Sequence, residues 1–358
     1  MRSIRKNEGN DMKIGILTAS RTDNNGTDLQ AYAMQELFRA HGCDAELIDY
    51  RCPKLENSRR ILHGFSIKAL ISVPYRVFDH ISRERFRKSR FHRSKERYSA
   101  NDMDLCGYDA IVVGSDQVWN PDLTGKDMGF FLPIETKSRK LSYAVSMGGA
   151  DAEACDKELG IASLLKGFET VSLREESGAE AIRKLGVPAR RDLDPLLMLP
   201  ADRWRRFAEP SGAKKPYIAV YAVGSAYRAV KAAEPIAGEL NARILLIGNP
   251  LRSVKGAKVK RFVSMRRWLG LIADAEAVVT DSYHCLSFCI AFGRPFVRME
   301  LEKASANRRL TDLIAAAGIK EAEPGKLTVY DAKETEERIA ELRKESEAYI
   351  ERIIGGTK

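Results

Sequence analysis

A single histidine stands where a strand-like run of the chain gives way to a helix-like run. His284 lies in the stretch AVVTDSYHCLSFCIAFGRPF, residues 277–296. The pattern predicts a buried strand at 278–280 and a helix at 285–292, with Ser282 able to cap it. Free amides in a first helical turn favour anions, so a histidine there is a candidate proton donor to an anionic substrate. The alternative is a hydrogen-bonded histidine in a helix cap.

Two further polar loops follow predicted strands, and each has a binding and a structural interpretation. Asn25 and Gly26 follow the first strand; they tolerate left-handed backbone and can present amides to a ligand, or simply form a tight loop. Asp116 and Gln117 follow the strand at 108–114, where they can orient an acceptor or cap a helix. Ligands of open α/β sheets bind beyond the carboxyl ends of the strands, so these loops are candidate site elements.

Strand-like and helix-like segments alternate along the chain, which predicts an α/β fold with parallel sheets. Strands are expected at 13–18, 45–50, 108–114, 141–145, 171–173, 217–222, 243–247, 259–262 and 278–280, and helices at 29–41, 179–185, 228–241, 266–274, 285–292, 310–317 and 334–354. A polar segment with prolines near residues 201–216 indicates a domain boundary. We therefore expect two Rossmann-like domains facing a cleft, the outline of a GT-B-type transferase.

The expected division of the chain has four parts. Residues 1–11 are charged and lack an apolar run, and they are interpreted as a disordered extension. Residues 12–200 form the first Rossmann-like domain, and residues 201–333 form the second, which carries the His284 loop. Residues 334–358 form a charged C-terminal helix.

The positive charge of the chain is concentrated in one segment. The net charge is +10, and residues 59–97 hold twelve Lys or Arg against three Asp or Glu. This segment is expected to be a basic helical insert in the first domain. It is compatible with a solvated insert packed on one face, with contact to an anionic membrane, or with a nucleic-acid patch. No stacking pattern of aromatics accompanies the cations, so we expect no nucleic-acid partner.

The cysteines and acidic pairs do not indicate a metal or disulfide framework. Six cysteines are spread along the chain, and Cys285 and Cys289 sit in an apolar run typical of buried thiols. We expect a reducing cytoplasm, with a peripheral position at the inner face of the membrane as one option. The acidic pair of residues 102–104 precedes a predicted strand rather than following one, and the pair of residues 192–194 sits beside Pro195, so we expect no metal.

Five motifs in order carry a resemblance to a known family. They are NG followed by LQAYA at 25–33, GSDQVWNP at 114–121, SLREESG at 172–178, DLDPLLML at 192–199 and TDSYHCLSFCIAFGRPFV at 280–297. Together they resemble the polysaccharide pyruvyl transferase family, over about residues 12–313. The resemblance implies a GT-B-like fold and transfer of pyruvate from phosphoenolpyruvate, as a ketal, onto a sugar of a cell-surface polysaccharide precursor. The implied acceptor is a sugar or lipid-linked oligosaccharide.

The resemblance also implies residue roles. His284 matches the family histidine and is expected to be the general acid, while Arg174 matches an arginine that clamps the donor anion; its alternative is an ion pair with a neighbouring glutamate. Ser282 stands where some members carry an arginine, and its hydroxyl and amide are expected to contact phosphate. The donor-binding candidates that lie downstream and would replace that arginine are Lys303, Asn307 and Arg308. No cofactor is expected beyond phosphoenolpyruvate as donor substrate.

Two rival functions remain open from the sequence. One is a nucleotide-sugar glycosyltransferase on the same GT-B-like fold, and it differs in its donor. The other is a non-catalytic GT-B-like protein that binds a polysaccharide or membrane partner. A pure binding protein needs neither a proton donor nor an anion clamp, so the presence of both His284 and Arg174 argues against the second.

Overall fold

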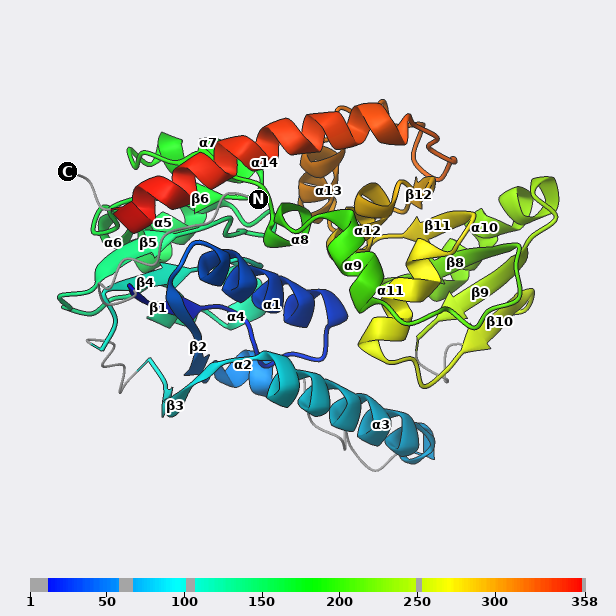
Figure 1. Ribbon diagram of the computed structural model, residues 1–358, viewed down its shortest axis with the longest axis horizontal. Helices are drawn as coiled ribbons and strands as arrows, with labels where there is room; N and C mark the ends of the chain where they lie inside the picture. Colours follow the sequence, from blue (N-terminus) through cyan, green and yellow to red (C-terminus); the bar gives the residue numbers. More distant parts are fainter. Residues whose placement is uncertain (1–11, 58–66, 101–106, 249–252, 356–358) are drawn as a thin grey trace.

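Two five-stranded parallel sheets form the framework of the protein (Figure 1). The computed structural model describes residues 12–57, 67–100, 107–248 and 253–355. The first sheet has the order β3-β2-β1-β4-β5, with strands β1 (Lys13–Leu17), β2 (Asp44–Tyr50), β3 (Arg93–Tyr98), β4 (Ala110–Val113) and β5 (Arg139–Ser142). The second has the order β10-β9-β8-β11-β12, with strands β8 (Tyr217–Tyr221), β9 (Arg243–Ile247), β10 (Ala257–Lys260), β11 (Ala277–Thr280) and β12 (Phe296–Arg298).

A short third pair of strands extends the first domain, and helices connect and cover all the strands. The pair is β6 (Ser172–Leu173) and β7 (Arg190–Arg191). The helices in the first half are α1 (Asn25–Ala40), α2 (Pro53–Asn57), α3 (Ile67–Arg90), α4 (Pro121–Thr124), η1 (Met128–Phe131), α5 (Ala152–Leu159), α6 (Ile161–Leu165), α7 (Glu176–Lys184), α8 (Pro195–Met198) and α9 (Ala201–Phe207). Those in the second half are α10 (Ala226–Glu239), α11 (Met265–Ala273), α12 (Tyr283–Phe292), α13 (Ala304–Ala316) and α14 (Ala332–Gly355).

The expected α/β fold with parallel sheets in both halves of the chain is confirmed, because every pairing between named strands is parallel. The predictions on residues 1–11, on residues 59–66 of the basic insert and on residues 102–104 lie outside the described residues.

The basic segment is not helical throughout, and this part of the expectation was wrong. Residues 93–98 form β3, an edge strand that pairs with β2. An edge strand needs a backbone partner on one side only, so a polar sequence is tolerated there and no apolar alternation marks it. The hydroxyl of Ser94 also accepts a bond from the Asp49 amide at 2.9 Å, which holds the strand in place.

Two arginines of the basic segment are buried ion-pair partners rather than surface charges. Arg83 and Arg87 on α3 bond the two carboxylate oxygens of Asp28, at 3.2 Å through Arg83 Nη1 and 2.8 Å through Arg87 Nε. Asp28 is fully buried in the first turn of α1. A buried carboxylate needs such partners, and removing one of them typically costs about 3–5 kcal/mol. The segment therefore anchors α3 to the start of α1.

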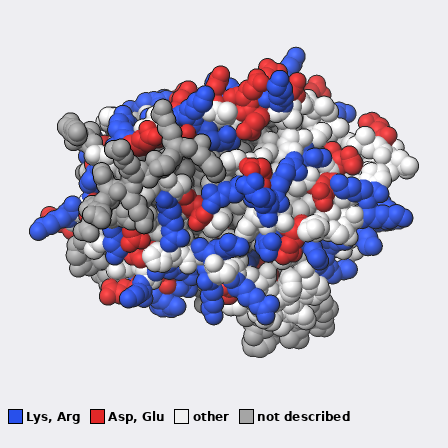
Figure 2. Space-filling model, in the orientation of Figure 1, with Lys and Arg blue, Asp and Glu red and all other residues white. Residues whose placement is uncertain are grey.

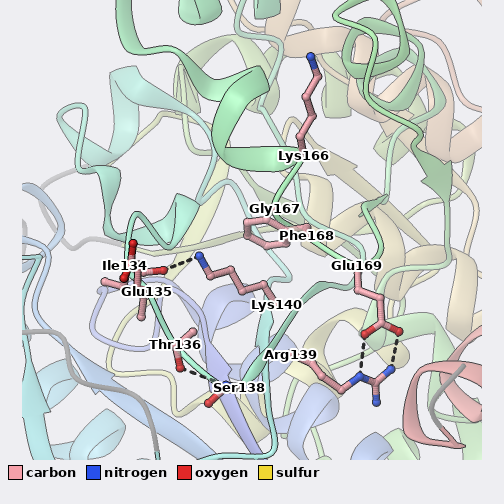
Figure 3. Close-up of a pocket in the computed structure, with 10 residues that line it drawn as sticks. All are labelled: Ile134, Glu135, Thr136, Ser138, Arg139, Lys140, Lys166, Gly167, Phe168 and Glu169. Atoms are coloured by element: carbon pink, nitrogen blue, oxygen red, sulfur yellow. Dashed lines mark hydrogen bonds and ion pairs between the residues drawn. The ribbon is translucent and has the colours of Figure 1, made fainter.

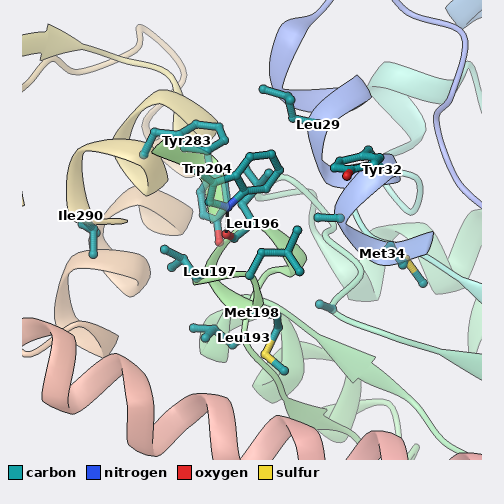
Figure 4. Packing of buried hydrophobic residues seen from close by; sticks show 14 of the residues in the cluster. Leu29, Tyr32, Met34, Leu193, Leu196, Leu197, Met198, Trp204, Tyr283 and Ile290 are labelled. Atoms are coloured by element: carbon teal, nitrogen blue, oxygen red, sulfur yellow. Dashed lines mark hydrogen bonds between the residues drawn. The ribbon is translucent and has the colours of Figure 1, made fainter. Parts of the chain in front are cut away.

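One apolar cluster joins the two sheets. It includes residues from α1, α8, α9 and α12, and Figure 4 shows Leu196 and Trp204 lying between Leu29 and Tyr32 on one side and Tyr283 on the other. Helix α14 then runs back from the second domain over the first (Figure 1), where the Tyr349 hydroxyl donates to the Ser142 carbonyl at 2.9 Å. These contacts fix the orientation of the domains and hence the geometry between them.

Candidate active site

The carboxyl ends of three neighbouring chain segments line one side of the site. Bridges join Asp116 to Val145 and Val145 to Leu173, so the residues that follow β4, β5 and β6 lie side by side. Arg174 is the first residue after β6, and its amide bonds the Val145 carbonyl at 3.0 Å. The loops after these strands bring Asp116 and Arg174 together from positions 58 residues apart in the chain.

His284 approaches this edge from the second domain. It lies in the first turn of α12, directly after β11, and Ser282 caps that helix by accepting a bond from the Cys285 amide at 3.4 Å. The Nε2 atom of His284 lies 3.5 Å from Nη1 of Arg174 and 3.9 Å from Oδ1 of Asp116. The structure therefore brings three candidate residues from two domains to one point.

The protonation state of His284 determines whether its Nε2 atom can bind Arg174 or Asp116. A guanidinium group can only donate hydrogen bonds, so Nε2 accepts from Arg174 only when it carries no proton. A protonated Nε2 would instead donate towards Asp116. Burial, with the positive charge of Arg174, lowers the pKa of His284 to about 4, although Asp116 acts in the opposite direction. The neutral imidazole is thus the resting form at neutral pH.

Arg174 is held among acidic groups in a buried position. Its Nη1 donates to Oδ2 of Asp194 at 3.0 Å, and its guanidinium stacks over the Tyr283 ring at 4.0 Å. Its Nη2 has no hydrogen-bond partner although it is buried, and the same is true of Oε2 of Glu175. Buried polar atoms are rarely left unpaired, so an orphan donor beside His284 marks a place for a polar ligand. The alternative interpretation, pairing with Glu175, also holds in part, since Nε of Arg174 lies 3.4 Å from Oε1.

Asp116 is the carboxylate that faces both catalytic candidates. Its Oδ2 accepts from the Thr27 hydroxyl at 2.6 Å, and its Oδ1 accepts from the Gln117 amide at 2.8 Å. Burial raises its pKa, but His284, Arg174 and these hydrogen bonds outweigh burial and hold the pKa below its usual range. Asp116 has a φ of 72°, which aspartate tolerates better than most residues. Its carboxylate points at the histidine rather than out to an acceptor.

A glycine is required at residue 26 because a side chain would not fit there, not because of its backbone conformation. It belongs to the first turn of α1, and a Cβ added there would overlap Cγ and Nδ1 of His284. Asn24 caps this helix by accepting from the Gly26 amide at 2.8 Å, so the expected helix start at residue 29 came four residues late. Asn25 itself lies in the helix. The first turn of α1 therefore positions His284 by contact with its ring.

The remaining expected donor-binding residues lie in different surroundings. Lys303 is exposed and pairs with Asp122 of the first domain at 2.5 Å. The side-chain amide of Asn307 makes two hydrogen bonds to the backbone of Leu301. Its oxygen accepts from the Leu301 N–H at 2.9 Å, and its nitrogen donates to the Leu301 carbonyl at 3.1 Å. Arg308 is exposed but lines a small cavity next to the site. Of the three, Arg308 is the one best placed to reach a ligand.

Arg309 is the residue that reasoning from the sequence missed. It is partly buried and lines the same cavity, of about 60 Å³, together with Glu175 and Gly148. Its pKa is lowered by burial and by Arg174, with Glu175 acting in the opposite direction. Among the described residues, no carboxylate lies within ion-pair distance of its guanidinium. The sequence gives no means of distinguishing Arg308 from Arg309. They differ only because they point to different sides of α13.

Gln117 lies beside Gly148, which lines this cavity, while other hollows of the surface do not belong to the site. Oε1 of Gln117 accepts from the side-chain amide of Asn120 at 3.2 Å, next to Gly148.

A larger hollow of about 580 Å³ lies at the start of β5, where Figure 3 shows Arg139 paired with Glu169 and Lys140 pointing towards Ile134. That is the amino end of the strand, opposite to the end that carries the His284 site.

The described part of the chain contains no cluster of histidine, cysteine and acidic residues able to hold a metal ion. Cys285 and Cys289 are free and buried. The arrangement offers a proton carrier at His284, an orphan cationic donor at Arg174 and a second cation at Arg309. These groups suit the protonation of an anionic substrate between two domains.

A family model described as polysaccharide pyruvyl transferase matches residues 24–301 of the chain. The matched region begins at the α1 cap and extends past β12, so it includes His284, Arg174 and Asp116 but ends before Lys303, Arg308 and Arg309. No curated protein is significantly similar to this chain in sequence.

Several solved structures are similar in overall arrangement. A UDP-GlcNAc 2-epimerase from Neisseria meningitidis bound to UDP-GlcNAc is 10% identical, with 97% of this chain and 94% of that chain covered and a TM-score of 0.47. An alpha-glucosyltransferase in complex with UDP and DNA is 11% identical, with 95% of each chain covered and a TM-score of 0.49. A UDP-N-acetylglucosamine 2-epimerase from Rickettsia bellii is 10% identical, with 96% and 98% covered and a TM-score of 0.42. Similarities of this size carry no information on the substrate of this chain.

Proposed function

This chain belongs to the polysaccharide pyruvyl transferase family, and from that premise we propose that it transfers pyruvate from phosphoenolpyruvate onto a sugar as a ketal. The observation that carries the proposal is the meeting of His284 and Arg174, from separate domains, at 3.5 Å beside an orphan guanidinium nitrogen. One group can supply a proton and the other can bind an anion, and the reaction needs both.

The donor carries a carboxylate and a phosphate, so its site needs more than one cation. Two donors are available. Arg174 Nη2 is buried without a hydrogen-bond partner, with Oδ1 of Asp116 at 3.7 Å, and the partly buried Arg309 lines the cavity. A guanidinium binds carboxylate or phosphate through two parallel hydrogen bonds. We propose that these two arginines hold the donor, with Arg308 at the rim, and that the hydroxyl of Ser282 donates to it; the Ser282 amide already donates to the Thr280 hydroxyl at 3.0 Å.

In the proposed mechanism, His284 protonates C3 of the enol, so that C2 becomes electron-poor. A sugar hydroxyl adds to C2 and gives its proton to the now neutral His284, and the C2–O bond to phosphate then breaks with its electron pair leaving on the phosphate. A second hydroxyl of the same sugar adds to C2 and loses its proton to the released phosphate, which closes the ketal. The products are the ketal and inorganic phosphate, and neither an oxidant nor a cofactor is consumed.

The low pKa of His284 is compatible with this role once the donor is bound. In the free protein, Arg174 lies 3.5 Å from Nε2 and disfavours the imidazolium. A bound donor brings negative charge to both arginines, which weakens that repulsion and raises the pKa of His284. Protonated Nε2 then has Asp116 as a counter-charge at 3.9 Å. Binding of the donor thereby promotes the protonation of His284 that the reaction requires.

We propose a sugar or lipid-linked oligosaccharide as the acceptor, entering between the domains from the side of Gln117 and Asn25. The test incubates the protein with phosphoenolpyruvate and candidate lipid-linked sugars and follows the products by mass spectrometry. A pyruvate ketal adds 70 Da to the acceptor, roughly the mass of pyruvate less water, and one phosphate is released. EDTA is expected to leave the rate unchanged, because the proposed acid and clamps are side chains.

The matched variants are His284→Gln and His284→Ala. Both are expected to abolish ketal formation while binding of phosphoenolpyruvate is partly retained, since Arg174 and Arg309 remain. Full turnover in either variant would exclude the proposed acid. Sugar transfer from a nucleotide sugar, with no use of phosphoenolpyruvate, would replace the proposal with the glycosyltransferase alternative.

A further inference from the structure

The outer face of α3 is an exposed stripe that is apolar at one end and cationic at the other. Val77, Ile81, Arg85 and Lys88 follow one another at spacings of four, four and three residues, which places them on one side of a helix. Val77 is 36% exposed and Ile81 is 45% exposed. The opposite side carries Arg83 and Arg87, which are buried against Asp28.

A segment of the second domain continues this surface. Phe262 follows β10 and is 45% exposed, and its ring meets the Phe78 ring of α3 edge-on at 5.4 Å between centroids. Phe262 has a φ of 53°, a conformation that is costly for an aromatic residue. Arg261 and Arg267, on either side of it in sequence, are exposed. An exposed aromatic residue flanked by cations therefore stands beside the apolar end of α3.

A groove of about 510 Å³ lies between α3 and the segment of the second domain. Its floor includes Phe86, Phe207 and Met265, and its rim carries Arg85, Arg90 and Arg266. Arg90 and Arg266 both lie over the Phe207 ring, at 5.4 and 5.5 Å from its centroid. The groove thus combines an aromatic floor with cations at its mouth.

We propose that this surface binds an anionic phospholipid membrane. We name it the α3 face; it is made of the α3 stripe, Arg90, residues 261–262 and 266–267, and the groove between them. Amphipathic surfaces with apolar residues among lysines and arginines bury the former at the lipid boundary and attract head-group phosphates with the latter. No described helix is both long and apolar enough to span a bilayer.

The charge of the α3 face is available for such binding. Within the described chain, Arg85, Lys88, Arg90, Arg261 and Arg267 form no ion pair, and the nearby acids Asp79 and Glu84 pair with the buried Arg83 and Arg87. Arg266 is the exception, since it lies 3.7 Å from Glu209, which also lines the groove. Figure 2 shows many Lys and Arg side chains over the middle and lower part of this view, where Figure 1 has α3 and α11, whereas acidic and basic side chains are mixed along the upper edge, over α14.

The α3 face lies one helix away from the catalytic corner. Arg83 and Arg87 hold Asp28, which stands two residues after Gly26, the residue in contact with the His284 ring. A membrane bound at the outer side of α3 would lie next to α1, the helix whose first turn contacts His284. The proposal concerns the surface alone and does not depend on the reaction assigned to the His284 site.

The test measures co-flotation of the full chain with vesicles. Vesicles of phosphatidylcholine with about one third phosphatidylglycerol are compared with pure phosphatidylcholine, at low and at high salt. We expect binding to the anionic vesicles that weakens with salt. The double variant Arg85→Glu with Lys88→Glu is expected to weaken it at least about tenfold, since each cation near such a surface contributes measurably to binding. Ile81→Asp is expected to weaken it through the apolar contact.

The matched control is Lys333→Glu with Lys344→Glu, two exposed cations of α14 on the opposite edge of the molecule. This variant is expected to bind as the unchanged chain does, and Arg267→Glu tests the second domain separately. Absence of binding by the unchanged chain, equal binding to neutral vesicles, or an equal loss in the α14 control would each overturn the proposal. So would salt-sensitive binding to DNA or an acidic protein without any binding to vesicles. Vesicle binding with no pyruvate transfer would leave this surface assigned and reject the proposed reaction instead.

Discussion

Gly26 in the first turn of α1 lies directly against the imidazole ring of His284 in the first turn of α12. The N-terminal turns of two helices, one from each domain, thus meet at the side chain that faces Arg174 and Asp116. No side chain larger than a hydrogen atom fits at residue 26 without moving the ring. The glycine therefore sets the position of the histidine relative to the first domain.

Gly26→Ala is expected to lower the rate of pyruvate transfer by about 10- to 100-fold, because a displacement of about 1 Å at a catalytic group can cost about 100-fold. Stability should fall less than activity, since alanine favours a helix. The measurement is the turnover number together with the thermal unfolding midpoint.

The control for this prediction is Gly238→Ala. Gly238 lies in α10, and a Cβ there would meet no atom within 4 Å. This variant should keep full activity and gain up to about 1 kcal/mol in free energy of unfolding. Equal activity of the Gly26 and Gly238 variants would show that the contact with His284 has no functional weight.

The sequence was sufficient to predict most strands of both sheets and the strand and helix on either side of His284, because buried strands and capped helices leave local patterns. It was not sufficient for the edge strands β12, which is only three residues long, and β3, whose polar residues are held by pairing with β2. Nor could it distinguish buried from exposed cations. Arg83 and Arg85 look alike in sequence, yet one bonds Asp28 and the other faces solvent. Such differences depend on which side of a helix meets a distant part of the chain.

The low pKa of His284 predicts a specific dependence of stability on pH. Its pKa is about 4 in the folded protein and about 6.5 in an unfolded chain, so between these values the unfolded state binds more protons. Stability conferred by the neutral histidine is complete above about pH 6.5 and falls as pH drops towards 4, by at most about 3 kcal/mol. His284→Gln cannot protonate and should lack this contribution.

The measurement is the free energy of unfolding of both proteins from pH 4.5 to 7.5. Their difference should shift in favour of the variant as pH falls. Burial raises the pKa of Asp192 to about 6, which acts in the opposite direction because a raised carboxyl pKa stabilises the fold at low pH and ceases to do so as pH rises through 6. That group is present in both proteins and cancels. A difference that stays constant with pH would mean that His284 is not buried in its neutral form.

Asp116→Asn removes the counter-charge of the protonated histidine while keeping shape and tolerance of the 72° backbone angle. The pKa of His284 in the donor complex should fall, because Asp116 acts to raise it. Since the protonated form is the proposed acid, the decline of kcat with rising pH should move to lower pH by about one unit, roughly a tenfold loss at pH 7.5. A merely structural role for Asp116 would lower kcat without moving the profile. Thr27→Val, which removes the 2.6 Å hydrogen bond but not the charge, should shift it less.

Arg309 and Arg308 provide a test of where the donor lies, because they are neighbours with different surroundings. Arg309 is partly buried beside Arg174 and Glu175, whereas Arg308 is exposed at the rim of the same cavity. Arg309→Gln is expected to raise the KM for phosphoenolpyruvate by at least tenfold, the usual scale for a lost charge-assisted hydrogen bond of about 1.5–3 kcal/mol. Arg308→Gln should raise it only a few-fold, since solvent screens an exposed cation. Initial rates at varied phosphoenolpyruvate and saturating acceptor separate KM from kcat, and the KM for the acceptor should stay unchanged in both variants. A larger effect at Arg308 than at Arg309 would place the donor outside the cavity and would return the assignment to the residue that the sequence alone had favoured.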